Sequence, residues 1–176
     1  YITQYGLSNW GVLFLQKGKG FSLAGASWII GFSEAFGVAG TVLSGWLSDK
    51  VFRGSRVKPV IVSGVFCLVS LCAFMFLGGS ALMNVLYVGI FSLSIGVVYC
   101  IVGGLMALDI VPRKATGAAL GVVGISSYVA AGLQDIISGY LIQGNSGADD
   151  VYNFTPVSIF WLSACLISLL IPLLNI

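Results

Sequence analysis

Long apolar runs separated by short polar connections dominate this chain. Five of these runs reach or exceed the roughly 20 apolar residues that an α-helix needs to cross a bilayer. A sixth run opens the chain and ends near Gln16. The pattern predicts an all-α membrane protein with six transmembrane helices, at residues 1–16, 21–47, 59–77, 81–108, 115–142 and 154–174.

The loop charges predict how these helices are oriented. The connections 48–59 and 109–114 hold six of the eight Lys and Arg residues, and they are alternate loops. Because short cytoplasmic loops carry an excess of Lys and Arg, we place both connections, and both chain ends, in the cytoplasm. The opposite side then receives Lys17, Lys19 and the loop containing Asp149 and Asp150.

The composition narrows the function classes. The chain is 58% hydrophobic and 8% charged, whereas a typical soluble domain has about 25% charged residues. It has no histidine, which excludes a Ser-His-Asp triad and an HExxH zinc site. We therefore predict no enzyme, no catalytic residue, no cofactor and no nucleic-acid partner. The cysteines fall in apolar segments without metal-ligand spacing and are predicted to be reduced packing residues: Cys67, Cys72, Cys100 and Cys165.

Glycines recur within the predicted helices. Between membrane helices, small residues permit close backbone contact, so the first interpretation is helix packing. The positions concerned are Gly37, Gly40, Gly103, Gly104, Gly117, Gly121 and Gly124.

Two carboxylates inside the predicted spans are candidate functional residues, because an ionisable side chain is expensive in a membrane. Glu34 lies near the middle of its helix, and no Lys or Arg lies deep in another span. We expect it to face a hydrated cavity or a partner outside this chain; the alternative is a protonated carboxyl that tethers two helices. Asp135, beside Gln134, lies nearer the external end, where a solvated interfacial carboxylate is an equal alternative.

A gate is predicted where the second helix ends. Asp49 lies within one turn of Arg53, and a carboxylate there can bind loop cations or the amino end of a neighbouring helix and so stabilise one transport state. A solvated turn is the plainer alternative. In the sister loop 109–114, the cations need no role beyond orienting the protein.

Aromatic and amide side chains complete the candidate binding site. Tyr1 and Gln4 are spaced to share one helical face, and Tyr99 and Tyr128 lie within otherwise apolar spans. Since a buried tyrosine hydroxyl needs a partner, we expect these residues to line a hydrated cavity.

Three segments resemble the organophosphate:phosphate antiporters of the major facilitator superfamily. YITQYGLSNW (1–10) is similar to the family's seventh helix, GTVLSGWLSDKVFRGSR (40–56) to its eighth helix and following loop, and VPRKATGAALGVVGISSY (111–128) to the turn into its eleventh helix. Their order and spacing fit the C-terminal six-helix half of such a transporter. The chain opens inside a helix without an initiator Met, so we expect an N-terminal half to precede it.

The resemblance implies an inner-membrane protein of two six-helix halves that exchanges an organic phosphate for inorganic phosphate by alternating access. It gives Tyr1, Glu34 and Tyr128 places along the substrate pathway. The stretch NWGVLFLQKGKG (9–20) resembles the glucose-6-phosphate branch, which indicates hexose 6-phosphate. The alternatives are a membrane sensor of external hexose phosphate and a glycerol 3-phosphate transporter.

Two positions depart from the family pattern. Gln4 stands where the bacterial antiporters have an arginine that clamps phosphate, and a neutral amide cannot neutralise that charge. Val97, Val98 and Tyr99 stand where those antiporters have an aromatic-Gly-Pro sequence, so the bending of this helix is expected to differ.

Overall fold

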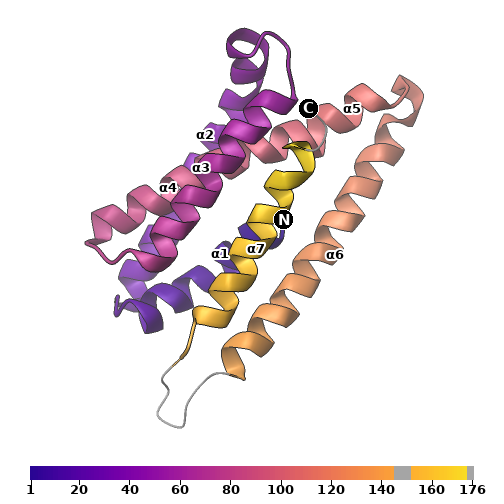
Figure 1. Cartoon of the computed structure of the whole chain (residues 1–176). Coiled ribbons are helices and arrows are strands. Elements are labelled where there is room, and N and C mark those ends of the chain that lie inside the picture. Colours follow the sequence, from indigo (N-terminus) through magenta and orange to yellow (C-terminus); the bar gives the residue numbers. More distant parts are fainter. Residues whose placement is uncertain (145–151, 174–176) are drawn as a thin grey trace.

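A computed structural model describes residues 1–144 and 152–173, and the Asp149–Asp150 loop lies outside these residues. Every regular element of the described part is a helix (Figure 1). The α-helices are α1 (Ile2–Leu13), α2 (Leu23–Trp46), α3 (Val57–Phe76), α4 (Ala81–Val98), α5 (Ala107–Ile110), α6 (Thr116–Gln143) and α7 (Thr155–Leu173). Shorter helical segments extend or precede them. Three are π-helical, η1 (Phe14–Gly18), η2 (Leu47–Val51) and η3 (Tyr99–Met106), and η4 (Arg113–Ala115) is a 3-10 helix.

Five continuous helical segments are long and apolar enough to cross a membrane. They are Leu23–Val51, Val57–Phe76, Ala81–Ile110, Arg113–Gln143 and Thr155–Pro172. The opening helix, α1 with η1, is shorter. The predicted fold class is confirmed: the protein is an all-helical, multi-pass integral membrane protein.

The helices form an uneven bundle. Helices α1 and α7 lie between α6 and the group formed by α2, α3 and α4 (Figure 1). The main buried core is built from α1, α2, α3, α4 and α7, and α6 contributes Ile142 alone among its described members. Helix α6 is therefore attached along one side only.

Glycines bring α2 and α4 into close contact. A Cβ atom at Gly40 would overlap the carbonyl oxygen of Leu93, and one at Gly96 would overlap the carbonyl oxygen of Gly37. These two helices can cross at this distance only because no side chain intervenes. The packing interpretation thus holds for Gly37 and Gly40.

The glycines of α6 behave differently. A Cβ atom at Gly117, Gly121 or Gly124 would meet no described atom within 4 Å. The expectation that they pack against another helix is therefore wrong within the described chain.

A buried polar network attaches α6 to α7. The indole Nε1 of Trp161 donates to Ser138 Oγ at 2.9 Å, and Gln134 Nε2 donates to the same oxygen at 2.8 Å. All three side chains are fully buried. Gly6 of α1 makes room for the indole, because a Cβ there would lie 2.7 Å from Trp161 Nε1.

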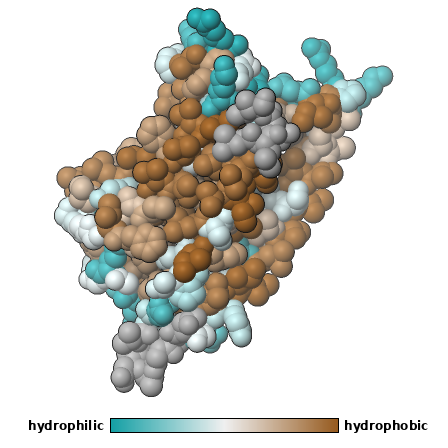
Figure 2. Space-filling model, in the orientation of Figure 1, coloured by the Kyte–Doolittle hydropathy of each residue, from teal (hydrophilic) through white to brown (hydrophobic). Residues whose placement is uncertain are grey.

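Hydrophilic residues gather at the two ends of the bundle, and hydrophobic residues cover most of the flank between them (Figure 2). Arg56 contacts Asp109, which places the loops 48–59 and 109–114 at one end; we call it the basic end. Lys19 contacts Leu77 and Asn84 at the opposite end. The two basic loops share one end, as a one-sided placement requires, and their assignment to the cytoplasm stays a prediction.

Helix α4 continues into a wide π-helical segment, η3, at Tyr99. The resemblance described above implies an aromatic-Gly-Pro sequence at this point, where the chain has Val97, Val98 and Tyr99. π-helical turns are often found at functional sites. The segment contains the Gly103–Gly104 pair, of which Gly103 approaches the hydroxyl of Tyr1.

Candidate functional site

Helix α1 presents hydrogen-bonding side chains to the helices on both sides of it. Gln4, Ser8, Asn9 and Trp10 all lie on this helix. Ser8 contacts a carboxylate of α2, whereas Asn9 and Trp10 contact a carboxylate of α6. We call these four residues the α1 donor strip.

The first carboxylate is Glu34. Its Oε1 accepts a hydrogen bond from Ser8 Oγ at 2.9 Å, and the side chain is exposed. No described lysine or arginine forms an ion pair with it. The second oxygen, Oε2, receives no hydrogen bond from the described residues and is free to accept one.

The second carboxylate is Asp135. Asn9 Nδ2 donates to Oδ1 at 3.0 Å and to Oδ2 at 2.9 Å, and Trp10 Nε1 donates to Oδ1 at 3.2 Å. Both donor groups, the Asn9 amide and the Trp10 indole, are neutral. Because Ser8 and Asn9 are consecutive, Glu34 and Asp135 lie at the same level of α1, one on each side.

Gln4 lies one turn before Ser8. Its Nε2 donates weakly to Ser8 Oγ at 3.4 Å, and its Oε1 is buried without a hydrogen bond from the described residues. Buried carbonyl oxygens are usually satisfied. Within the α1 donor strip, Gln4 thus keeps an acceptor oxygen without a hydrogen bond from the described residues.

Four tyrosines form a chain of rings at the start of α1. Tyr1 stacks on Tyr99 with ring centroids 4.4 Å apart and lies 6.1 Å from Tyr5, whose ring is 6.5 Å from that of Tyr128. The Tyr99 hydroxyl is buried without a partner among the described residues. Tyr128 is 70% exposed. The ring chain thus runs from the buried hydroxyl of Tyr99 to an exposed tyrosine of α6.

A cavity of about 710 Å³ lies beside the first residues of α1, between α3, η3, α6 and α7. Tyr1 and Tyr99 line it as expected, but Gln4 and Tyr128 do not. The lining is mostly apolar, with hydroxyls from serines such as Ser127 and Ser168. The predicted polar cavity of Tyr1, Gln4 and Tyr128 faces the missing half of the transporter, and it stays a prediction.

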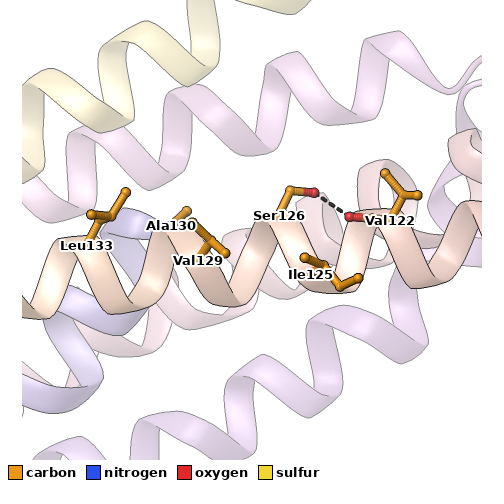
Figure 3. Close-up of a pocket in the computed structure, with 6 residues that line it drawn as sticks. All are labelled: Val122, Ile125, Ser126, Val129, Ala130 and Leu133. Carbon is orange, nitrogen blue, oxygen red and sulfur yellow. Dashed lines mark hydrogen bonds between the residues drawn. The ribbon is translucent and has the colours of Figure 1, made fainter.

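A second, shallow hollow lies on α6 itself. Figure 3 shows that one helix supplies all six lining side chains: Val122, Ile125, Ser126, Val129, Ala130 and Leu133. The hydroxyl of Ser126 is used within the helix, since it donates to the Val122 carbonyl. The hollow is thus an apolar surface without a polar group to orient a ligand.

At the basic end, Arg56 joins two helix ends. Its Nη1 lies 3.0 Å from Asp49 Oδ1 and donates to Ser48 Oγ at 2.8 Å, and its Nε lies 3.2 Å from Asp109 Oδ2. The loop cation that contacts Asp49 is Arg56, while Arg53 is exposed and makes no ion pair among the described residues. The gating role of Asp49 and Arg53 stays a prediction. Arg56 ties the end of α2 to α5.

At the opposite end, Lys19 is held without a carboxylate. Its Nζ donates to Asn84 Oδ1 at 2.6 Å and to the Leu77 carbonyl at 3.0 Å, and it lies 4.6 Å from the centroid of the Phe74 ring. Burial disfavours the charged form and lowers the pKa of Lys19 to about 8. The amide of Asn84 is itself fully buried, so Lys19 links the α1–α2 connection to the turn between α3 and α4.

Comparison with known proteins identifies the family. The model of the Major Facilitator Superfamily matches residues 1–134. The chain belongs to this superfamily.

The curated relatives include transporters of organic phosphates and a membrane sensor protein. The chain is 30% identical over 172 residues to the glycerol-3-phosphate transporter of Bacillus subtilis, covering 96% of this chain and 37% of that protein. It is 30% identical over 137 residues to the probable hexose phosphate transport protein of Chlamydia trachomatis, covering 74% of this chain and 29% of that protein. It is 27% identical over 135 residues to the membrane sensor protein UhpC of Escherichia coli, covering 76% of this chain and 30% of that protein.

The chain thus spans about a third of the length of these relatives. The superfamily and its named members are transporters and a sensor, which agrees with the prediction that the chain is not an enzyme.

Proposed function

We propose that this chain is the C-terminal half of an inner-membrane transporter that exchanges hexose 6-phosphate for inorganic phosphate by alternating access. The relatives named for glycerol 3-phosphate and hexose phosphate support an organic phosphate as substrate. The resemblance of residues 9–20 to the glucose-6-phosphate branch favours the hexose ester. An N-terminal half would supply the other wall of the substrate site.

The observation that carries this proposal is the chemistry of the α1 donor strip and its two carboxylates. Glu34, Asp135 and the amides of Gln4 and Asn9 gather beside tyrosine rings, with no described cation among them. Carboxylates accept hydrogen bonds from hydroxyl groups and repel phosphate. This wall therefore suits the hydroxylated carbon skeleton of the substrate, and the phosphate would draw its neutralising charge from the other half.

The candidate residues take distinct roles in this proposal. Glu34 and Asp135 accept sugar hydroxyls, Gln4 donates or accepts one neutral hydrogen bond, and Tyr1 and Tyr99 line the inner end of the path. Tyr128 faces the other half from α6. Asp49 acts at the gate through Arg56, and Arg53 only adds positive charge to that loop.

The test uses the full-length transporter in proteoliposomes, with binding of hexose 6-phosphate and of inorganic phosphate measured side by side. Hydrogen bonds to charged groups contribute about 1.5–3 kcal/mol, so Glu34→Gln and Asp135→Asn should weaken hexose 6-phosphate binding by about 10- to 150-fold. Binding of inorganic phosphate should stay unchanged, since it has no carbon skeleton. Tyr140→Phe, an exposed change on the same helix as Asp135, serves as the control.

Gln4→Ala should cost less, about 0.5–1.5 kcal/mol in hexose 6-phosphate binding, because it removes a neutral hydrogen bond. Equal losses for both ligands in the carboxylate variants would contradict the assignment of this wall to the carbon skeleton.

A sensor is the second candidate, favoured by the similarity to the membrane sensor protein UhpC. A sensor would bind external hexose 6-phosphate without exchanging it. Binding without exchange in proteoliposomes would select the sensor, and preferential exchange of glycerol 3-phosphate would replace the hexose ester as substrate.

A further inference from the structure

Two cysteines that are far apart in the sequence meet inside the bundle. The Sγ atoms of Cys67 on α3 and Cys165 on α7 lie 3.8 Å apart, although the residues are 98 positions apart. Their exposed fractions are 1% and 4%. The other two cysteines, Cys72 and Cys100, are only half-buried, and all four are free thiols. The sequence pattern does not indicate this pair.

The two thiols are in direct contact. Their 3.8 Å separation is that of a hydrogen bond from the Cys165 thiol to the Cys67 sulfur, whereas a disulfide requires an S–S distance of about 2.04 Å. A single atom about 2.3 Å from each sulfur, the length of a zinc–thiolate bond, draws the two sulfurs together far less than a direct bond does. Both sulfurs therefore lie within reach of one bridging atom.

The surroundings decide which kind of atom can bind. A structural zinc ion needs four ligands, and in residues 1–144 and 152–173 no group of three or more His, Cys, Asp or Glu could hold a metal ion. An atom that completes its valence with two sulfurs and one organic substituent needs no further protein ligand and so fits this pair. Trivalent arsenic does so, and Cys67 and Cys165 both line the 710 Å³ cavity, which gives the substituent an apolar space.

We propose that Cys67 and Cys165 form a dithiol site for monosubstituted trivalent arsenicals, whose occupation ties α3 to α7. The reaction is a condensation without oxidation or reduction. Two S–H bonds and the As=O bond of the arsenical break, two As–S bonds form, and the oxygen leaves with both protons as water. This inference does not depend on the transported substrate.

A cross-link between positions 67 and 165 should be visible as added stability. The adduct stays on both sulfurs when the chain unfolds, so it closes a long loop and restricts the unfolded state. The bridge joins two helices that already pack together, so it need not distort the native bundle.

The experiment treats the purified full-length protein with phenylarsine oxide and follows adduct mass, thiol labelling and unfolding temperature. We expect an adduct that blocks Cys67 and Cys165 together, raises the unfolding temperature, and is released by 2,3-dimercaptopropanol but not by a monothiol. Cys67→Ala and Cys165→Ala should each abolish these effects. Cys72→Ala and Cys100→Ala are the matched controls and should retain them.

Three results would overturn the proposal. They are the absence of any adduct at Cys67 and Cys165 in the full-length protein, an adduct that persists in Cys67→Ala, and an adduct lost equally in the Cys72→Ala control. If Cys67→Ala does not fold, protease mapping of the adduct on the unmodified sequence decides the same question.

Discussion

Helices α2 and α6 both carry glycines at helical spacing, but they use them in opposite ways. Gly40 of α2 lies against the backbone of α4, with no room for a Cβ atom. Gly121 of α6 has open space around it. Only 11% of the apolar stretch of α6 is buried inside the chain, against 50% for the helix that contains α4. The glycines of α2 allow a close helix–helix contact within the described residues. The glycines of α6 leave a smooth surface, and its partner must be another protein element or lipid outside these residues.

The largest expected effect comes from filling the closed contact. Gly40→Ala places a methyl group against the Leu93 carbonyl, and over-packing of this kind costs about 1–3 kcal/mol. The variant should unfold at a lower temperature in detergent or yield less folded protein. Gly121→Ala is the matched control, which should be neutral or gain up to about 1 kcal/mol from helix propensity. Equal destabilisation of both variants would remove the distinction.

The open surface is tested with a larger side chain. Gly121→Leu should leave the unfolding temperature of the full-length protein nearly unchanged and yet reduce exchange strongly, if this face of α6 packs on the other half during transport. Val69→Phe adds similar bulk to an exposed position of α3 and should leave exchange intact. Normal exchange by Gly121→Leu would indicate that the α6 surface faces lipid.

Ion pairs at the basic end add a weaker connection between α2 and the helix that contains α4. Arg56 joins the end of α2 to α5, which continues α4 through η3. Exposed ion pairs contribute at most about 1 kcal/mol, so Asp49→Asn should change stability little but shift the gate equilibrium and reduce exchange up to about five-fold. Arg53→Gln, at an arginine without an ion pair in the described chain, is the control. If Asp49→Asn exchanges substrate in proteoliposomes at the wild-type rate, Asp49 has no role in the gate.

The smallest effect is a pH dependence at the other end of α4. The folded-state pKa of Lys19, about 8, lies below the ordinary value, so the unfolded state binds the proton more tightly. Stability should therefore rise as the pH increases from about 8 towards the ordinary lysine pKa of about 10.4. The unfolding temperature, measured across this pH range, should not rise in the Lys19→Met variant. It should still rise in Lys17→Met, which is the control.

The sequence was sufficient for the fold class because the apolar runs are longer than a bilayer requires. It also singled out Glu34 and Asp135, since a carboxylate is conspicuous in an apolar span. Their partners on α1 could not be predicted, because Ser8 and Asn9 meet them across 26 and 126 positions of sequence. Such contacts depend on helix rotation, which hydropathy does not specify.

Which loop cation pairs with Asp49 could not be predicted for a similar reason. Arg53 is nearer in sequence, but it adopts a left-handed conformation with φ of 52° and Gly54 follows with φ of 84°. The chain reverses there, and Arg56 is the arginine that returns to Asp49. The loop charges place Lys19 at the end opposite the basic loops. Its burial against Asn84 depends on the turn between α3 and α4, and no sequence pattern predicts that contact.

In the proposed function, α1, α2 and α6 form the wall that binds the carbon skeleton of an organic phosphate. The structure of the full-length protein with bound hexose 6-phosphate tests it most directly. We predict sugar hydroxyls within hydrogen-bond distance of Glu34 and Asp135, the phosphate held by the N-terminal half, and the α6 glycines facing that half. A phosphate group bound against Gln4 by this half alone, or Glu34 and the α6 glycines facing lipid, would contradict the account.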